Sequence, residues 1–235
     1  MTTFLRTYAD ARASGFDNIR ADIMYGIPEG TLDSFRESLH TLARLSPEHI
    51  SAYGLKIEEG TVFDRLRHTL TLPDEDTEYD MYLAMTEVLS DYGYQKYEIS
   101  NFAKEGRASR HNLRYWQGKD YLGFGVAAHS CFRGVRFGNS RDLPRFLRGE
   151  DITEESEVLT EEDRLTEWIM LSLRLREGLD ESVLRSRFGR TVESLSPRLP
   201  QYLRDGYMKR EEGRLFFTDK GFFVSNTILA DLLNF

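Results

Sequence analysis

Apolar and polar positions along the first two thirds of the chain predict strands that alternate with amphipathic helices. Short apolar runs such as NIRADIMYGI and HISAYGLKI are typical of buried strands, whereas apolar residues at helical spacing indicate amphipathic helices. The predicted elements are, in chain order, helix 4–14, strand 18–27, a helix capped by Thr31, strand 49–57, helix 76–92, and strands 94–100 and 120–130. Apolar strands in a strand–helix–strand order predict a parallel sheet with helices outside it.

The pattern changes after residue 148. Residues 149–163 carry eight acidic residues and no basic one, which favours a solvated connector. Helical patterns follow at 160–176 and 180–188, then a hairpin signal with Gly213 at its turn, then a final amphipathic helix at 222–235. Three helices and a hairpin are typical of a winged-helix domain. The sequence therefore predicts two domains, 1–148 and 149–235.

Composition and charge narrow the class of protein. Hydrophobic residues make up 40% of the chain and charged residues 30%, which is ordinary for a folded protein. The net charge of −8 disfavours nucleic-acid binding, because phosphate recognition needs clustered basic residues. A DNA-binding winged helix is the alternative, and its candidate wing residues are Lys209, Arg210, Arg214 and Lys220, beside Glu211 and Glu212. No apolar run has the length of a membrane span or the core of a signal peptide, so a cytoplasmic protein is expected.

The segment RHNLRYW, residues 110–116, holds the first candidate chemistry. On a helix, His111 and Tyr115 share a face because they are four residues apart, and Asn112 and Trp116 form a neighbouring ridge. Such a group suits a flat aromatic ligand, and a neutral imidazole nitrogen can ligate iron. The alternative is that both aromatic residues belong to the core and that the histidine satisfies a buried carbonyl. These residues alone favour that alternative.

Three weaker signals stand elsewhere. Gly123 and Gly125 precede His129 in DYLGFGVAAHS, where glycines indicate a close approach to the backbone. Asp22 lies in an apolar strand, where it must be paired, hydrogen-bonded or functional, for example toward a ribose. Cys131 is the single cysteine, so this chain has no internal disulfide and no cluster built from several of its own thiolates. We expect Cys131 to be a small buried side chain.

The order and spacing of longer segments resemble one family. These segments are ADIMYGIPEGT, PEHISAYGLKIEEGT, LPDEDTEYDMY, YEISNFA, RHNLRYWQGKDYLGFG, AHS and IMLSLRLREGLD. Together they are similar to the radical-SAM haem chaperones, the HemW group, which are relatives of oxygen-independent coproporphyrinogen III oxidase. The resemblance implies an α/β fold: the C-terminal half of a partial (β/α)6 TIM-like barrel, followed by a small winged-helix-like α+β domain. It also implies a protein that binds haem and passes it to haem-acceptor apoproteins.

The resemblance assigns roles to individual residues. It implies a haem-binding element made of His111, Asn112, Tyr115 and Trp116, with His111 as the iron ligand. It implies contacts with S-adenosylmethionine at Asp22, at Lys56 and at His129. The family's glycine-rich GxGPGAHS reads GFGVAAHS here, which implies a tighter backbone at Val126 and Ala127.

The sequence departs from the family at its start. Neither the CxxxCxxC loop for a [4Fe-4S] cluster nor the GGGTP strand is present, so we expect an N-terminally truncated form. Radical chemistry needs three protein thiolates, so catalysis by this chain alone is not expected. The strand at 18–27 would then have an unpaired edge that favours self-association. The alternative functions are an enzyme like oxygen-independent coproporphyrinogen III oxidase, or an inactive fragment of either protein.

Overall fold

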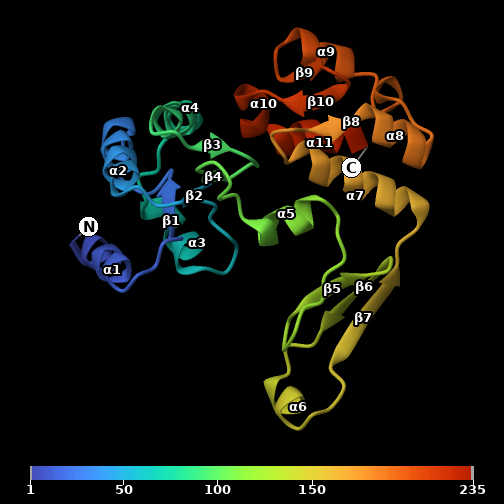
Figure 1. The fold of residues 1–235 in the computed structure, drawn as a ribbon, viewed down its shortest axis with the longest axis horizontal. Coiled ribbons are helices and arrows are strands. Elements are labelled where there is room, and N and C mark those ends of the chain that lie inside the picture. The colour runs from blue at the N-terminus through green and yellow to red at the C-terminus, as the bar shows by residue number, and fades with distance from the viewer. Residues whose placement is uncertain (1, 234–235) are drawn as a thin grey trace. The chain divides into compact units, whose positions relative to one another are not determined.

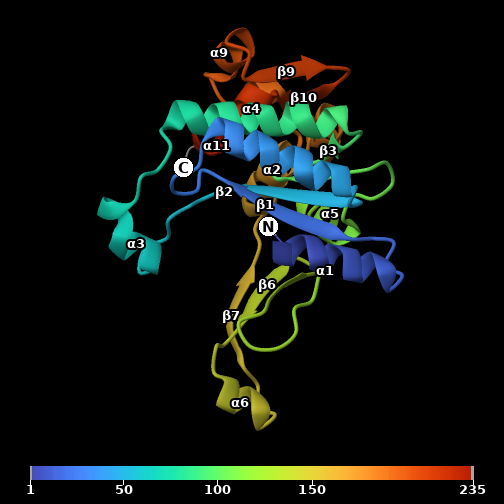
Figure 2. The ribbon, with the colours of Figure 1, turned by 90° about the vertical axis from the view of Figure 1, so that its left-hand side faces the viewer.

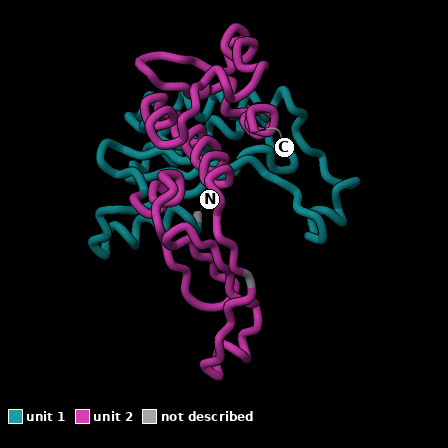
Figure 3. The backbone as a smooth tube through the Cα atoms, turned by 90° about the vertical axis from the view of Figure 1, so that its right-hand side faces the viewer, with its two compact units in different colours: residues 1–109 teal, residues 110–235 magenta. Residues whose placement is uncertain are grey.

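The chain forms two compact units, residues 1–109 and residues 110–235 (Figure 3). The fold comes from a computed structural model that describes residues 2–233. Within those residues, no helix has both the length and the apolar character that crossing a bilayer requires. Each unit is described separately below.

The first unit contains most of the elements that the sequence predicts. Its helices and strands are α1 (Thr2–Ala13), β1 (Arg20–Tyr25), α2 (Leu32–Leu45), β2 (His49–Gly54), α3 (Val62–Leu66), η1 (Arg67–Thr69), α4 (Glu75–Asp91), β3 (Gln95–Lys96) and β4 (Asn101–Ala103). Thr31 caps α2 through a hydrogen bond that its side chain accepts from the Ser34 backbone N–H. Asp74 caps α4 in the same way and accepts from the N–H of Thr77.

The sheet of the first unit is mixed, which corrects the expectation of a parallel sheet. Its strand order is β1-β2-β4-β3, and only the β1–β2 pair is parallel. The reason is the short connection between β3 and β4. Residues 97–100 are too few for a crossover helix, so β4 turns back as a hairpin and inserts between β2 and β3. β3 itself runs in the same direction as β2, as the α4 crossover predicts.

One face of this sheet is the core of the first unit. Ala21, Ile50 and Phe102 are aligned across β1, β2 and β4, and all three are buried. Helices α2 and α4 lie side by side over this face (Figures 1 and 2). Their buried side chains are Phe35, Leu39, Leu42 and Ala43 of α2, and Met81, Tyr82, Ala84, Met85, Val88 and Leu89 of α4. The opposite face of the sheet therefore carries the polar residues of the strands.

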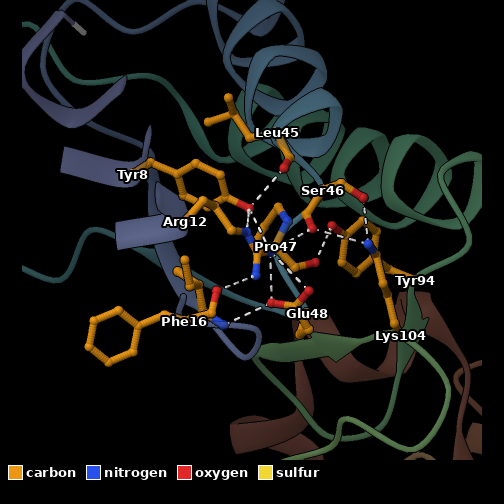
Figure 4. A network of polar contacts seen from close by, with 10 residues as sticks. Tyr8, Arg12, Phe16, Leu45, Ser46, Pro47, Glu48, Tyr94 and Lys104 are labelled. Carbon is orange, nitrogen blue, oxygen red and sulfur yellow. Dashed lines mark hydrogen bonds and ion pairs between the residues drawn. The ribbon is translucent and has the colours of Figure 1, made fainter. Parts of the chain in front are cut away.

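A polar network ties α1 to the start of β2 (Figure 4). The hydroxyl of Tyr8 donates to the carbonyl oxygen of Leu45 at 2.8 Å, and the Arg12 guanidinium pairs with Glu48 at 2.8 Å. Burial alone would raise the pKa of Glu48, but the N–H of Ile19 and the Arg12 guanidinium together lower it below its usual value. The network therefore holds α1 against the sheet through a carboxylate that stays charged.

The second unit begins with a short helix and a small antiparallel sheet. These elements are α5 (Arg110–Trp116), β5 (His129–Phe132), β6 (Val135–Asn139), α6 (Leu143–Leu147) and β7 (Thr153–Val158), with strand order β5-β6-β7. The solvated connector predicted at 149–163 is wrong in part, because β7 lies within it and pairs with β6. As an edge strand, β7 tolerates the charged side chains that suggested a loop. The strand expected at 120–130 is also wrong in extent. Within residues 120–128, the single β-bridge joins Tyr121 to Cys131, and Gly125 and Ala127 have left-handed backbones that do not suit a strand.

The end of the chain has the predicted helices and hairpin. Its elements are α7 (Glu161–Leu173), β8 (Leu179–Asp180), α8 (Glu181–Phe188), η2 (Val192–Ser194), α9 (Leu199–Arg204), β9 (Met208–Glu211), β10 (Arg214–Phe217), α10 (Asp219–Phe223) and α11 (Ser225–Leu233). The hairpin turns at Glu212 and Gly213, whose φ angles of 51° and 73° suit a two-residue turn. Strand β10 lies between β8 and β9. The final predicted helix divides at Val224, and its last two residues lie outside the described range.

The predicted domain division at residues 148 and 149 stays a prediction. By backbone proximity the compact units divide after Ser109, and β7 pairs with β6 across the predicted division. The short sheet thus belongs to the same compact unit as the C-terminal helices.

Candidate functional site

Helix α5 presents the pair that its sequence predicts. The rings of His111 and Tyr115 meet edge to face, with centroids 4.9 Å apart and planes at 89°. Tyr115 also meets Tyr121 edge to face at 4.6 Å. His111 is exposed and Tyr115 retains 37% of its surface, so this face is open. Among the described residues, none makes a hydrogen bond to the His111 imidazole. The three rings therefore form an accessible aromatic surface with a free imidazole.

The neighbouring ridge of α5 is half-buried. Asn112 and Trp116 both have intermediate exposure, and no residue of α5 is fully buried. The interpretation of RHNLRYW as a core segment therefore does not hold. The helix is short and largely exposed, which suits contact with something outside it.

A tight loop after α5 positions Tyr121. The Arg114 guanidinium donates to the carbonyl oxygen of Asp120 at 2.7 Å, and the carboxylate of Asp120 accepts from the backbone N–H of Arg133 at 3.1 Å. Tyr121 and Cys131 exchange both backbone hydrogen bonds, at 2.8 and 3.1 Å. The loop therefore links α5 to the start of the β5–β6 hairpin and sets the Tyr121 ring against Tyr115.

The glycines of DYLGFGVAAHS allow close contacts within their own loop. A side chain at Gly123 would lie 2.4 Å from the carbonyl oxygen of His129, so the close approach expected there is with the chain itself. Ala127 has a left-handed backbone with φ 57°, at the position where the resemblance expects glycine. His129 is exposed at the start of β5 and faces the small hollow lined by Asn139 and Glu154.

Asp22 lies in the middle of β1, and Lys56 lies just after the carboxyl end of β2. Asp22 is on β1 and its side chain is 49% exposed, with the Arg20 guanidinium 3.1 Å away. Asp22 is therefore paired, which is one of the alternatives that the sequence left open, and it lies on the sheet face opposite α2 and α4. Lys56 follows β2, is 82% exposed and pairs with Glu58 at 3.0 Å. His129 belongs to the second unit.

The same sheet face holds buried polar residues that the sequence analysis did not single out. Ser51 and Asn101 align with Asp22 across β1, β2 and β4, and both are buried. Within the described residues, His49 Nδ1, Ser51 Oγ, Asn101 Oδ1 and both carboxylate oxygens of Glu98 have no hydrogen bond. The polar residues at alternate positions of HISAYG could have predicted this polar sheet face, because alternate strand residues lie on the same face. This face is suited to a polar ligand or a further polar segment.

Two of these buried groups have shifted pKa values. Burial lowers the pKa of His49 to about 4, with the charge of Arg20 adding to the effect and Asp22 opposing it. His49 Nε2 and the Tyr97 hydroxyl share a hydrogen bond of 2.8 Å. Burial raises the pKa of Glu98. His49 is therefore neutral at physiological pH.

The described residues do not fit an iron–sulfur cluster. Within residues 2–233, no group of three or more histidine, cysteine or acidic side chains could hold a metal ion. Cys131 has intermediate exposure, so the expectation of a buried side chain is only partly met. A cluster of the radical-SAM type would need thiolates that these residues do not supply.

Comparison with solved structures defines the class of fold. The chain matches coproporphyrinogen III oxidase (HemN) from Escherichia coli, a radical SAM enzyme, with a TM-score of 0.76 over 97% of this chain and 58% of that one. The sequence identity is 20%, so this likeness concerns the fold alone. It confirms the predicted fold class, a part of a radical-SAM-type α/β barrel followed by a C-terminal domain. The sheets are open, as a partial barrel requires.

Sequence comparisons then identify the relatives. Residues 159–224 match the HemN C-terminal domain family. The chain is 33% identical to haem chaperone HemW of Bacillus subtilis over 97% of its length, and 30% identical to that of Lactococcus lactis over 95%. It is 29% identical to the Escherichia coli HemW over 93%. The chain is therefore related to the HemW proteins over almost its whole length, and the predicted resemblance is confirmed. It spans 62% of the Bacillus and Lactococcus proteins.

Proposed function

We propose that this chain binds haem on α5 and passes it to an acceptor apoprotein. The observation that carries the proposal is the open face formed by His111, Tyr115 and Tyr121. The relatives named as haem chaperones support it, because they match the chain across this helix.

The proposed chemistry is coordination and stacking. A neutral imidazole nitrogen of His111 would ligate the haem iron. Tyr115 and Trp116 would contact the porphyrin, and Asn112 would orient the ligand through its amide. Exposure of His111 suits a chaperone, because a ligand held on an open surface can pass to an acceptor without unfolding of the carrier.

We also propose that Asp22, Lys56 and His129 contact S-adenosylmethionine in the intact family architecture. The exposed carboxylate of Asp22 suits hydroxyl groups, and the aligned Ser51 and Asn101 would add polar contacts. With a reduced cluster, S-adenosylmethionine supplies a carbon radical, and the described residues hold no thiolate set for that cluster. Radical catalysis is therefore not proposed for these residues alone.

A haem titration tests the function. Ferric haem added to the wild-type chain should give a saturable shift of its Soret band, and His111→Ala should abolish that shift. His68→Ala is the matched control, since His68 is an exposed histidine of the first unit. Equal, weak and unsaturable binding by the wild type and His111→Ala would contradict the proposal.

We further propose that β1 mediates self-association. Within residues 2–233, β1 pairs only with β2, and Met24 on this edge strand is 46% exposed. An unpaired strand edge binds other strands, and a charge on it opposes this. Light scattering should show a mass that grows with concentration, and Met24→Lys should reduce this growth whereas Met24→Leu should not. A wild-type monomer at every concentration would contradict the proposal.

A further inference from the structure

A cavity of about 540 Å³ lies beside α5 within the second unit. Tyr115 of α5 and the loop after it form one wall, the turn of the β5–β6 hairpin forms another, and α7 and α8 form the third. This volume falls in the range of small-molecule sites. Tyr115 connects the cavity to the candidate haem element, because its ring contacts His111.

The cavity is cationic in an acidic protein. Its basic lining residues are Lys119, Arg133, Arg136, Arg164 and Arg187, and its acidic ones, among the residues described, are Asp120 and Glu167. Arg136 and Glu167 pair with each other, so their charges cancel. The chain as a whole has a net charge of −8, so this concentration of positive charge is local.

Four of these cations lack an ionic partner. Within residues 2–233, no ion pair engages Lys119, Arg133, Arg164 or Arg187, and all four side chains are exposed. By contrast, Arg136, Arg176, Arg198 and Arg210 of the same unit each pair with an acid. The cavity rim is therefore able to accept an anionic group without breaking an existing ion pair.

The walls between these cations are apolar and aromatic. Tyr121, Trp168 and Leu171 have intermediate exposure and line the cavity, and Leu159 is buried behind them. A ring system can contact these walls while charged substituents reach the rim. The combination favours a flat aromatic ligand with carboxylates along one edge.

The backbone at the β5–β6 turn makes room for the rim. Arg133 and Gly134 have φ angles of 52° and 78°, which suit a two-residue hairpin turn. A side chain at Gly134 would lie 2.8 Å from the Arg164 guanidinium. The glycine therefore allows Arg164 to lie against the turn, next to the cavity.

We propose that this cavity holds the carboxylate edge of a porphyrin, with Arg164 and Arg187 as its anion-binding residues. The inference rests on the proposed haem function, and it adds a second anchor that does not depend on the iron. A porphyrin bears its two propionate groups on one side of the ring, which matches cations grouped on one rim. His111 would hold the iron, and the arginines would fix the orientation of the ring.

Two porphyrin probes separate the two anchors. Protoporphyrin IX has the carboxylates but no iron, and ferric protoporphyrin dimethyl ester has the iron but no free carboxylates. The double variant Arg164→Gln/Arg187→Gln should weaken protoporphyrin IX binding about tenfold, measured by porphyrin fluorescence. It should bind the ferric dimethyl ester as the wild type does. His111→Ala should show the reverse pattern.

The same titrations include a control variant and can overturn either anchor. Arg204→Gln removes an exposed arginine of α9 outside the cavity and should leave both affinities unchanged. Unchanged protoporphyrin IX affinity in the double variant would overturn the cavity assignment and leave His111-dependent haem binding intact. Loss of the His111 effect with a retained arginine effect would instead overturn the iron ligand. Thermal melts of each variant would confirm that the fold is retained.

Discussion

Two histidine–tyrosine pairs of the molecule have similar ring contacts and opposite surroundings. His49 meets Tyr97 edge to face at 5.7 Å in the first unit, and His111 meets Tyr115 edge to face at 4.9 Å in the second. His49 is 4% exposed and hydrogen-bonded to its tyrosine, whereas His111 is exposed and free of hydrogen bonds from described residues. The ring contact does not distinguish the two histidines, and neither does an unused ring nitrogen, because His49 Nδ1 has no hydrogen bond among the described residues. Accessibility does: His49 is buried, whereas His111 is open to the iron ligation that we propose.

The largest expected difference between the two pairs is the stability that the first unit loses at low pH, when His49 becomes protonated. Its pKa is about 4 in the folded state and about 6.5 in the unfolded state, so the unfolded state binds more protons between these values. The His49 contribution is therefore complete above pH 6.5 and is lost as the pH falls toward 4, by up to about 3 kcal/mol. Glu98, whose pKa is raised, acts with the opposite sign.

The measurement is hydrogen exchange of the β2 amides from pH 7 to pH 4.5. The difference in opening free energy between the wild type and His49→Asn isolates the histidine from Glu98. A His49→Asn curve parallel to the wild-type curve would contradict the lowered pKa of His49.

The next largest difference is the stability cost of removing a polar contact near each histidine–tyrosine pair. Glu48→Gln removes the charge that Arg12 and the Ile19 N–H contact in a partly buried network, so it should destabilise the first unit by roughly 1–3 kcal/mol. Arg114→Gln, on α5, loses an exposed hydrogen bond and should cost less than about 0.5 kcal/mol. Urea unfolding with local exchange readouts compares the two. Equal costs would contradict the contrast between a packed sheet and an open helix.

The smallest effect lies in the loop that follows α5. Ala127 adopts φ 57°, which costs a residue with a side chain about 1 kcal/mol relative to glycine. The extra freedom of glycine in the unfolded chain offsets part of this gain, so Ala127→Gly should stabilise the second unit by roughly a few tenths of a kcal/mol. Val126→Gly, where φ is not positive, should destabilise instead. Thermal unfolding measures both, and a destabilised Ala127→Gly would contradict the strain.

Much of the fold was predictable from local signals. Thr31 and Asp74 cap their helices, Gly213 turns its hairpin, and the α2 and α4 apolar faces pack on the sheet as their spacing indicates. The strand predicted at 94–100 is confirmed only as β3 (Gln95–Lys96), and β4 (Asn101–Ala103) was not predicted, because the apolar pattern does not show where a short hairpin turns back. The acidic β7 was missed because charge hides a strand that lies at a sheet edge.

The candidate site was predictable in part. The spacing of His111 and Tyr115 predicts their contact on a helix, and the structure has it. Exposure was not predictable, and the residues alone favoured a core role. Tyr121 lies in the loop directly after α5, but no sequence signal predicts the turn that sets its ring against Tyr115. Arg164 and Arg187 come from helices distant in the sequence, so no local pattern could join them to α5.

The most direct test of the central claim is chemical rescue of the iron ligand. Ferric haem is bound to the wild type and to His111→Ala, and each spectrum is recorded with and without free imidazole. If His111 ligates the iron, the variant loses the wild-type Soret position and imidazole restores it, because the free ring enters the space that the side chain leaves. A variant whose spectrum equals that of the wild type without imidazole would contradict the account.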